Sequence, residues 1–80
     1  MKRSRHEIFS KILKICANGA SKTRIVYQAN LNFRTVNPYL QTLIKNNLLE
    51  ASQDGHILYK TTKEGENLQE TISQISDALM

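Results

Sequence analysis

The side chains best suited to chemistry are polar groups spaced along one segment of this 80-residue chain, residues 33–46. Arginine can donate two hydrogen bonds to guanine, and asparagine and glutamine match adenine, because these side chains complement the base edges in the major groove. The candidates for base contacts are Arg34, Thr35, Asn37 and Gln41. In a helix, their spacing places them away from the apolar face. The pattern therefore predicts a helix that reads double-stranded DNA.

A second group of candidates suits the DNA backbone rather than the bases. Ser21 is expected to cap a helix over residues 22–29, whose free N–H groups favour phosphate. Lys22 and Arg24 in its first turn are therefore the strongest phosphate candidates. The remaining candidates for DNA contacts are Thr23, Asn32, Lys45, His56, Lys60, Arg3 and Arg5. The last two belong to a basic arm, which is either a DNA contact or solvating charge at the start of the sequence.

The distribution of charge supports a polyanionic partner. Residues 1–49 carry nine Lys or Arg and one acid, which gives +8, whereas residues 50–80 carry two against six, which gives −4. The sum is the net charge of +4. A basic body with an acidic C-terminal part is the electrostatic footprint expected of a nucleic-acid-binding protein.

Other kinds of chemistry have little support. One cysteine, Cys16, excludes an internal disulfide, and with two distant histidines it gives no metal-ligand spacing, so it is expected in the core. Glycine-rich phosphate loops, paired carboxylates and nucleophile–base motifs are absent, so we expect no enzyme activity, cofactor or metal. Without a long apolar run or the apolar stretch of a signal peptide, we expect one cytoplasmic, nucleoid-associated domain, 1–80, with no membrane contact.

The elements that position these residues follow from apolar spacing and capping residues. Helices are expected over residues 5–17, 22–29, 33–46 and 63–78. The expected caps of the first, third and last helices are Ser4 with Glu7, Asn32, and Thr62 or Thr61. Pro38 either kinks the third helix or makes it begin late, behind Asn37. The long helix is favoured because its apolar face then consists of Phe33, Val36, Leu40, Leu43 and Ile44.

A β-hairpin is expected around Asp54-Gly55. A two-residue turn would place Ala51 opposite Leu58. A three-residue loop with Gly55 in the left-handed region instead places Ala51 opposite Ile57 and Leu49 opposite Tyr59. The second register gathers the large apolar side chains except Leu58 on one face, so it is the expected one. His56, Leu58 and Lys60 would then point outward.

This order of elements predicts a mainly α fold with a small β-hairpin: a winged helix-turn-helix with a C-terminal dimerisation helix, 63–80. A three-helix bundle with an added hairpin is the competing fold. The narrow seam of the last helix is typical of a coiled coil. The expected dimer contacts are Phe9, Leu13, Leu68, Ile72, Ile75 and Leu79, of which Leu68 and Ile72 also pack under the first helix. The alternative is a monomer whose last helix covers the core.

Several motifs resemble those of small archaeal winged helix-turn-helix proteins, over nearly the whole chain. They are the run Lys-Thr-Arg-Ile-Val-Tyr-Gln-Ala-Asn-Leu-Asn at 22–32, Tyr39-Leu40 with Leu43, Leu48-Leu49, Tyr59, and Thr62-Lys63-Glu64-Gly65. The resemblance implies DNA binding, by a transcriptional regulator or by a chromatin-associated dimer with paired C-terminal helices. Asn47, where this group usually has glycine, and Pro38 depart from the pattern.

Two classes of function therefore remain. In the favoured class, residues 33–46 enter the major groove of double-stranded DNA, in a transcriptional regulator or an architectural chromatin protein. In the other, the same fold is an adaptor whose basic face meets an acidic protein.

Overall fold

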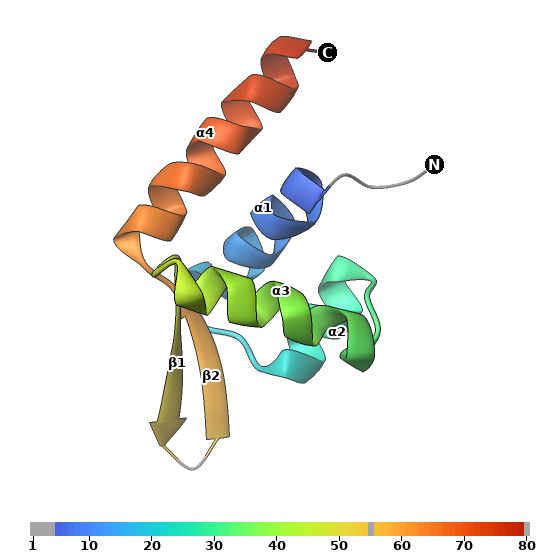
Figure 1. The fold of residues 1–80 in the computed structure, drawn as a ribbon, viewed down its shortest axis with the longest axis vertical. Helices are drawn as coiled ribbons and strands as arrows, with labels where there is room; N and C mark the ends of the chain where they lie inside the picture. The colour runs from blue at the N-terminus through green and yellow to red at the C-terminus, as the bar shows by residue number, and fades with distance from the viewer. Residues whose placement is uncertain (1–4, 55, 80) are drawn as a thin grey trace.

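Four α-helices and a two-stranded antiparallel hairpin make up the computed structural model, which describes residues 5–54 and 56–79 (Figure 1). The elements are α1 (Arg5–Ile15), a 3₁₀ turn η1 (Cys16–Asn18), α2 (Lys22–Ala29), α3 (Phe33–Lys45), β1 (Leu49–Asp54), β2 (His56–Thr61) and α4 (Lys63–Leu79). The predicted mainly α fold with one small hairpin is confirmed. Within the described ranges, no helix is long and apolar enough to cross a bilayer.

Capping residues fix where α2 and α3 begin. The Ser21 hydroxyl accepts a hydrogen bond from the Arg24 N–H at 3.2 Å, and Asn32 Oδ1 accepts one from the Thr35 N–H at 2.6 Å. Both predicted caps are confirmed, whereas Ser4, the predicted cap of α1, lies outside the described residues. α3 continues through Pro38, as the long-helix interpretation requires.

The connection from α3 to β1 passes through a left-handed residue and is tied to the start of α4. Asn47 has a φ of 60°, a conformation that asparagine tolerates better than most residues, which explains why it can replace glycine here. Its carbonyl accepts a 2.8 Å hydrogen bond from the Thr62 hydroxyl. The same hydroxyl oxygen accepts the Gly65 N–H at 3.0 Å, so Thr62 is the cap of α4.

The hydrophobic core lies where α1, α2, α3 and the base of the hairpin meet. Its buried members are Ile12, Leu13, Cys16, Ala20, Ile25, Val26, Val36, Leu40, Leu43, Leu49 and Tyr59. Two predictions need correction. Phe33 and Ile44 are 50% and 40% exposed, because they lie at the edges of the apolar face of α3. Leu13, expected at a dimer interface, is 1% exposed and packs inside its own chain.

The predicted register of the hairpin is wrong by two residues. Ala51 lies opposite Tyr59, and Leu49 lies opposite Thr61, whereas the prediction paired Ala51 with Ile57. A shift of two residues leaves each side chain on its predicted face, because side chains alternate along a strand. Ile57 is 51% exposed. The register is therefore not set by the burial of the large apolar side chains of the hairpin. The predicted turn at Gly55 lies outside the described residues.

Hydrogen bonds to α1 and to the connection between η1 and α2 hold β2 in place instead. Tyr59 exchanges two backbone hydrogen bonds with Ala20, at 2.8 and 2.9 Å. The Thr61 hydroxyl donates a 2.6 Å hydrogen bond to the carbonyl of Leu13 in the buried core. These bonds satisfy groups that would otherwise be buried without partners, a loss that costs more than exposing one apolar side chain at the hairpin.

We predict that Gly65→Ala lowers the stability of the fold by about 2 kcal/mol. A Cβ at Gly65 would collide with the Leu48 carbonyl and lie 2.7 Å from Thr61 Cγ2. At an unobstructed helix position the same change would stabilise the protein by about 1 kcal/mol, so the sign of the effect is informative.

Urea unfolding followed by circular dichroism measures this effect. Asn67→Ala, at an exposed position of α4 two residues away, is the matched control and is expected to be neutral or slightly stabilising. A Gly65→Ala protein at least as stable as the parent would contradict the close packing of α4 on the connection between α3 and β1.

Candidate nucleic-acid interface

α3 has two contrasting sides. Val36, Leu40 and Leu43 point inward and are at most 2% exposed. The outward side is exposed along the length of the helix and consists of Arg34, Thr35, Asn37, Pro38, Gln41, Thr42 and Lys45. The prediction that the polar side of residues 33–46 faces solvent is therefore confirmed. We call this side the α3 outer face.

The turn between α2 and α3 sets the angle at which this face is presented. Asn30 ends α2 in the left-handed conformation, with a φ of 56°. The Leu31 N–H then donates to the Val26 carbonyl at 2.9 Å, and the Leu31 side chain packs against the core. Asn32 uses its side-chain oxygen to cap α3, so only its amide nitrogen remains for the predicted DNA contact.

The electrostatics of this part of the chain are one-sided. Residues 8–49 contain no Asp or Glu, and their six cationic residues are Lys11, Lys14, Lys22, Arg24, Arg34 and Lys45. Arg34 and Lys45 stand at the two ends of the α3 outer face, and the predicted candidates Lys22 and Thr23 open α2. Arg5 also reaches this region, because it lines a hollow of ≈ 340 Å³ together with Thr35, Pro38 and Thr42.

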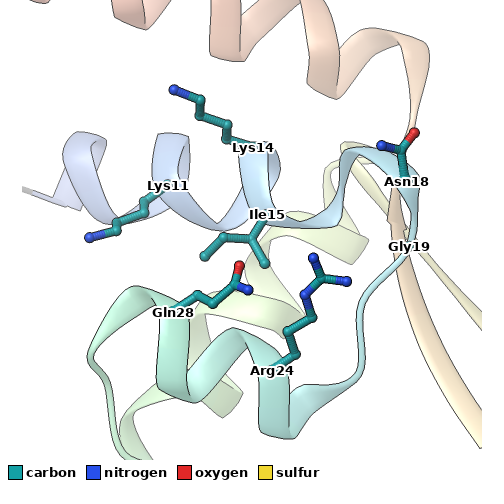
Figure 2. Close-up of a pocket in the computed structure, with 7 residues that line it drawn as sticks. All are labelled: Lys11, Lys14, Ile15, Asn18, Gly19, Arg24 and Gln28. Atoms are coloured by element: carbon teal, nitrogen blue, oxygen red, sulfur yellow. The ribbon is translucent and has the colours of Figure 1, made fainter.

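Arg24, a predicted phosphate contact at the start of α2, lies away from the α3 outer face. Figure 2 shows its guanidinium in a cleft between α1 and α2, with α3 behind both helices. The cleft has a volume of ≈ 380 Å³ and is lined by Lys11, Lys14, Ile15, Asn18, Gly19, Arg24 and Gln28. Sequence reasoning missed Lys11 and Lys14 as candidates. Their i, i+3 spacing, which places them side by side on a helix, was the available signal.

In the hairpin, Lys60 is exposed, as its predicted outward direction requires. It lies directly opposite Glu50, which offsets its charge. It lines a depression of ≈ 280 Å³ with Asn18 and Gly19, so it sits on the η1 side of the hairpin. The side chain of His56, and all of Arg3, lie outside the described part of the structure. Their predicted DNA contacts stay predictions.

Cys16 has the buried environment that was expected. Its side chain is 0% exposed. Burial raises the pKa of the thiol from 9.0 to about 12, and the nearby charge of Arg24 opposes the rise. Among the residues that the structure describes, no three His, Cys, Asp or Glu side chains cluster as metal ligands would.

Comparisons with known proteins agree on one fold family. The chain matches the family described as "Winged helix-turn-helix" over residues 2–79. It is 30% identical to an uncharacterized protein of Methanocaldococcus jannaschii over 98% of this chain and 78% of that one. The structure of Sso10a-2, a DNA-binding protein from Sulfolobus solfataricus, superimposes with a TM-score of 0.89 at 27% identity, covering 95% of this chain and 81% of the other.

A more distant structure, that of Bordetella bronchiseptica BpsR, superimposes with a TM-score of 0.80 at 18% identity and covers 96% of this chain but 56% of that one. At this identity the likeness concerns the fold alone. These matches confirm the predicted winged helix-turn-helix and leave the competing three-helix bundle without support.

We predict that iodoacetamide at pH 8 alkylates Cys16 in the folded protein about 1,000-fold more slowly than a free cysteine. A pKa of about 12 instead of 9.0 lowers the thiolate fraction by roughly that factor. Mass spectrometry follows the reaction, and the same protein in urea, where the ordinary rate should return, is the control. Equal rates in both conditions would contradict a buried thiol.

The raised pKa also links stability to pH. The Cys16 thiol ionises at a lower pH in the unfolded chain than in the folded one, so its ionisation lowers the free energy of unfolding progressively above about pH 9.

Proposed function

Because this chain belongs to the winged helix-turn-helix family, we propose that it binds double-stranded DNA with the α3 outer face in the major groove. The observation that carries the proposal is the exposure of Arg34, Asn37 and Gln41 on one side of a helix whose other side is locked in the core. The likeness to Sso10a-2, which is described as a DNA-binding protein, supports it.

The contacts divide into those that select bases and those that hold the backbone. Arg34 suits guanine, and Asn37 and Gln41 suit adenine. Thr35 and Pro38 can pack against a thymine methyl group. Lys45, on this face, and Arg5, which lines a hollow beside it, suit phosphates at the edges of the groove, and Lys22 in the first turn of α2 is a further phosphate candidate.

The presence of three side chains able to distinguish bases favours a transcriptional regulator over a purely architectural protein. An architectural protein needs contacts to phosphate and to DNA shape, and gains little from amide groups aimed at base edges. The adaptor function also stays open to test, because an adaptor with a basic face would not depend on Arg34 or Gln41 for DNA binding.

We predict that Arg34→Ala weakens binding to a preferred duplex by about 1–3 kcal/mol and reduces the preference over random DNA. Lys45→Ala should weaken binding to both duplexes alike and lower the salt slope by about 1, because it removes one phosphate contact. Fluorescence anisotropy at several salt concentrations, with the protein's own promoter and a random duplex, measures both effects.

Lys63→Ala, an exposed change in the first turn of α4, is the control and should alter neither quantity. Equal affinity of the parent protein for promoter and random DNA would favour the architectural role. Unchanged DNA binding by Arg34→Ala and Lys45→Ala together would rule out the α3 outer face as the interface.

A second proposal concerns assembly: two copies of the chain pair through α4. α4 rises past α1, and its C-terminal part stands away from the other helices (Figure 1). Ile75 in this part is 54% exposed, and Leu68 nearer the body is 37% exposed. A helix that exposes a narrow apolar seam to water is stabilised when this seam is buried against a second seam. The side chain of Leu79, also predicted in this interface, lies outside the described residues.

The seam is continuous with an apolar groove that supports the same pairing. The groove has a volume of ≈ 420 Å³ and lies between α1, α3 and α4, with Phe9, Leu43 and Leu48 facing Ile72 and Ile75. Phe9 is itself held by an edge-on contact with Tyr39, whose ring centroid is 5.1 Å away. This surface enlarges an interface that the short seam alone would leave marginal. In an antiparallel pair, both α3 outer faces meet one two-fold-related DNA site.

We predict that Ile75→Glu shifts the protein from twice the chain mass of 9.2 kDa to a monomer. The new carboxylate would have to be desolvated in the interface, which is unfavourable. Analytical ultracentrifugation measures the mass. Gln74→Glu adds the same charge at the adjacent exposed position, off the seam, and should leave the dimer intact. A parent protein that sediments as a monomer at all concentrations would refute the pairing.

A further inference from the structure

Three cationic side chains lie around a cleft that the proposed DNA interface does not use. Arg24 projects from α2 into the cleft between α1 and α2, whereas Lys11 and Lys14 extend from α1 away from Arg24, at the rim of the cleft (Figure 2). The amide groups of Gln28 and Asn18 add hydrogen-bond donors to the same cleft. Its lining contains no acidic residue, so its electrostatic potential favours an anion.

The cleft continues into the depression beside the hairpin. Asn18 and Gly19 line both hollows, and a side chain at Gly19 would meet nothing within 4 Å, so the passage between them is open. The second hollow adds Lys60, with Glu50 beside it. We call the two hollows together the back groove. A long groove with cations spaced along it fits a chain of phosphates better than a single small anion.

The back groove faces away from the α3 outer face. α3 lies behind α1 and α2 in Figure 2, where the cleft opens toward the viewer, and it lies in front of them in Figure 1. A straight duplex seated on the α3 outer face would therefore lie on the other side of the domain from the cleft, and we expect a phosphate in the back groove to belong to a different molecule.

We infer that the back groove is a phosphate-binding site that takes the backbone of a second DNA duplex, so that one domain holds two duplexes. The inference rests on the proposed function in one respect: it takes a first duplex to be bound at the α3 outer face. Arg24, Asn18 and Gln28 line a cleft between two helices and not the exposed side of a helix that could enter the major groove, so we expect contacts to phosphates and binding that is independent of sequence. The same phosphate chemistry would admit a free phosphorylated anion, which the experiment below distinguishes.

The test is an amide ¹H–¹⁵N NMR titration of the full chain carrying Ile75→Glu, which keeps a second copy from contributing a second α3. A 12-base-pair duplex is added past one equivalent, and inorganic pyrophosphate is added in a separate arm. We expect the amides of Arg34 and Gln41 to shift first. The amides of Asn18, Gly19 and Gln28 should then shift in a weaker second phase.

Variants assign the second phase to the groove. Lys11→Gln with Lys14→Gln should weaken the second phase about tenfold and lower its salt slope by about 2, because two phosphate contacts are lost. The first phase should stay unchanged. Lys63→Gln, which removes a lysine outside both surfaces, should leave both phases as they are.

The outcomes separate this inference from the proposed function. If the duplex never shifts Asn18, Gly19 and Gln28 while pyrophosphate does, the site binds free phosphate and the second-duplex assignment is overturned. If neither probe shifts them, the back groove is not a site. If these amides shift first and those of α3 stay still, the back groove stands and the α3 interface fails.

Discussion

The orientation of the proposed DNA-binding surface depends on the burial of one side of α3. Val36, Leu40 and Leu43 are inserted among the side chains of the core, and each contributes roughly 1.5–3 kcal/mol by leaving water. Turning the helix by one residue, 100°, would expose this stripe and bury the polar side. No hydrogen bond available to Arg34 or Gln41 could offset that loss. The solvent exposure of the α3 outer face is thus a consequence of packing.

A few polar contacts attach the hairpin and α4 to this packed core. The pairing of Ala20 with Tyr59 and the hydrogen bond from Thr61 to Leu13 attach the hairpin to the core. The contact of Thr62 with the carbonyl of Asn47 fixes where α4 departs. The bond from Thr61 lies in the buried core, where a hydrogen bond is worth more than a comparable bond in water. The direction of α4, and with it the direction of its seam, follows from them.

Local features of the sequence sufficed to predict the helices, and tertiary contacts decided what the sequence did not reveal. Ser21 and Asn32 cap their helices through the next three residues, so the starts of α2 and α3 could be read from short segments. The hairpin register depends instead on Ala20, almost forty residues away from Tyr59, and alternation within the strands cannot encode it. Likewise, the position of Arg24 in α2 was predictable, but the side of the molecule its guanidinium reaches depends on where α1 packs.

Residues 8–49 contain no acid and place cations on both sides of the domain. Net charge alone therefore could not distinguish a surface suited to base contacts from one suited only to phosphate contacts. The placement of the side chains does distinguish them. On the α3 outer face, arginine is interleaved with asparagine and glutamine, which match particular bases. In the proposed back groove, Arg24, Asn18 and Gln28 line a cleft between helices instead of an exposed helix face, which suits contacts to phosphates more than contacts to base edges. A domain with both surfaces can select a site with one and hold neighbouring DNA with the other, so regulation and DNA organisation need not be alternatives in this protein.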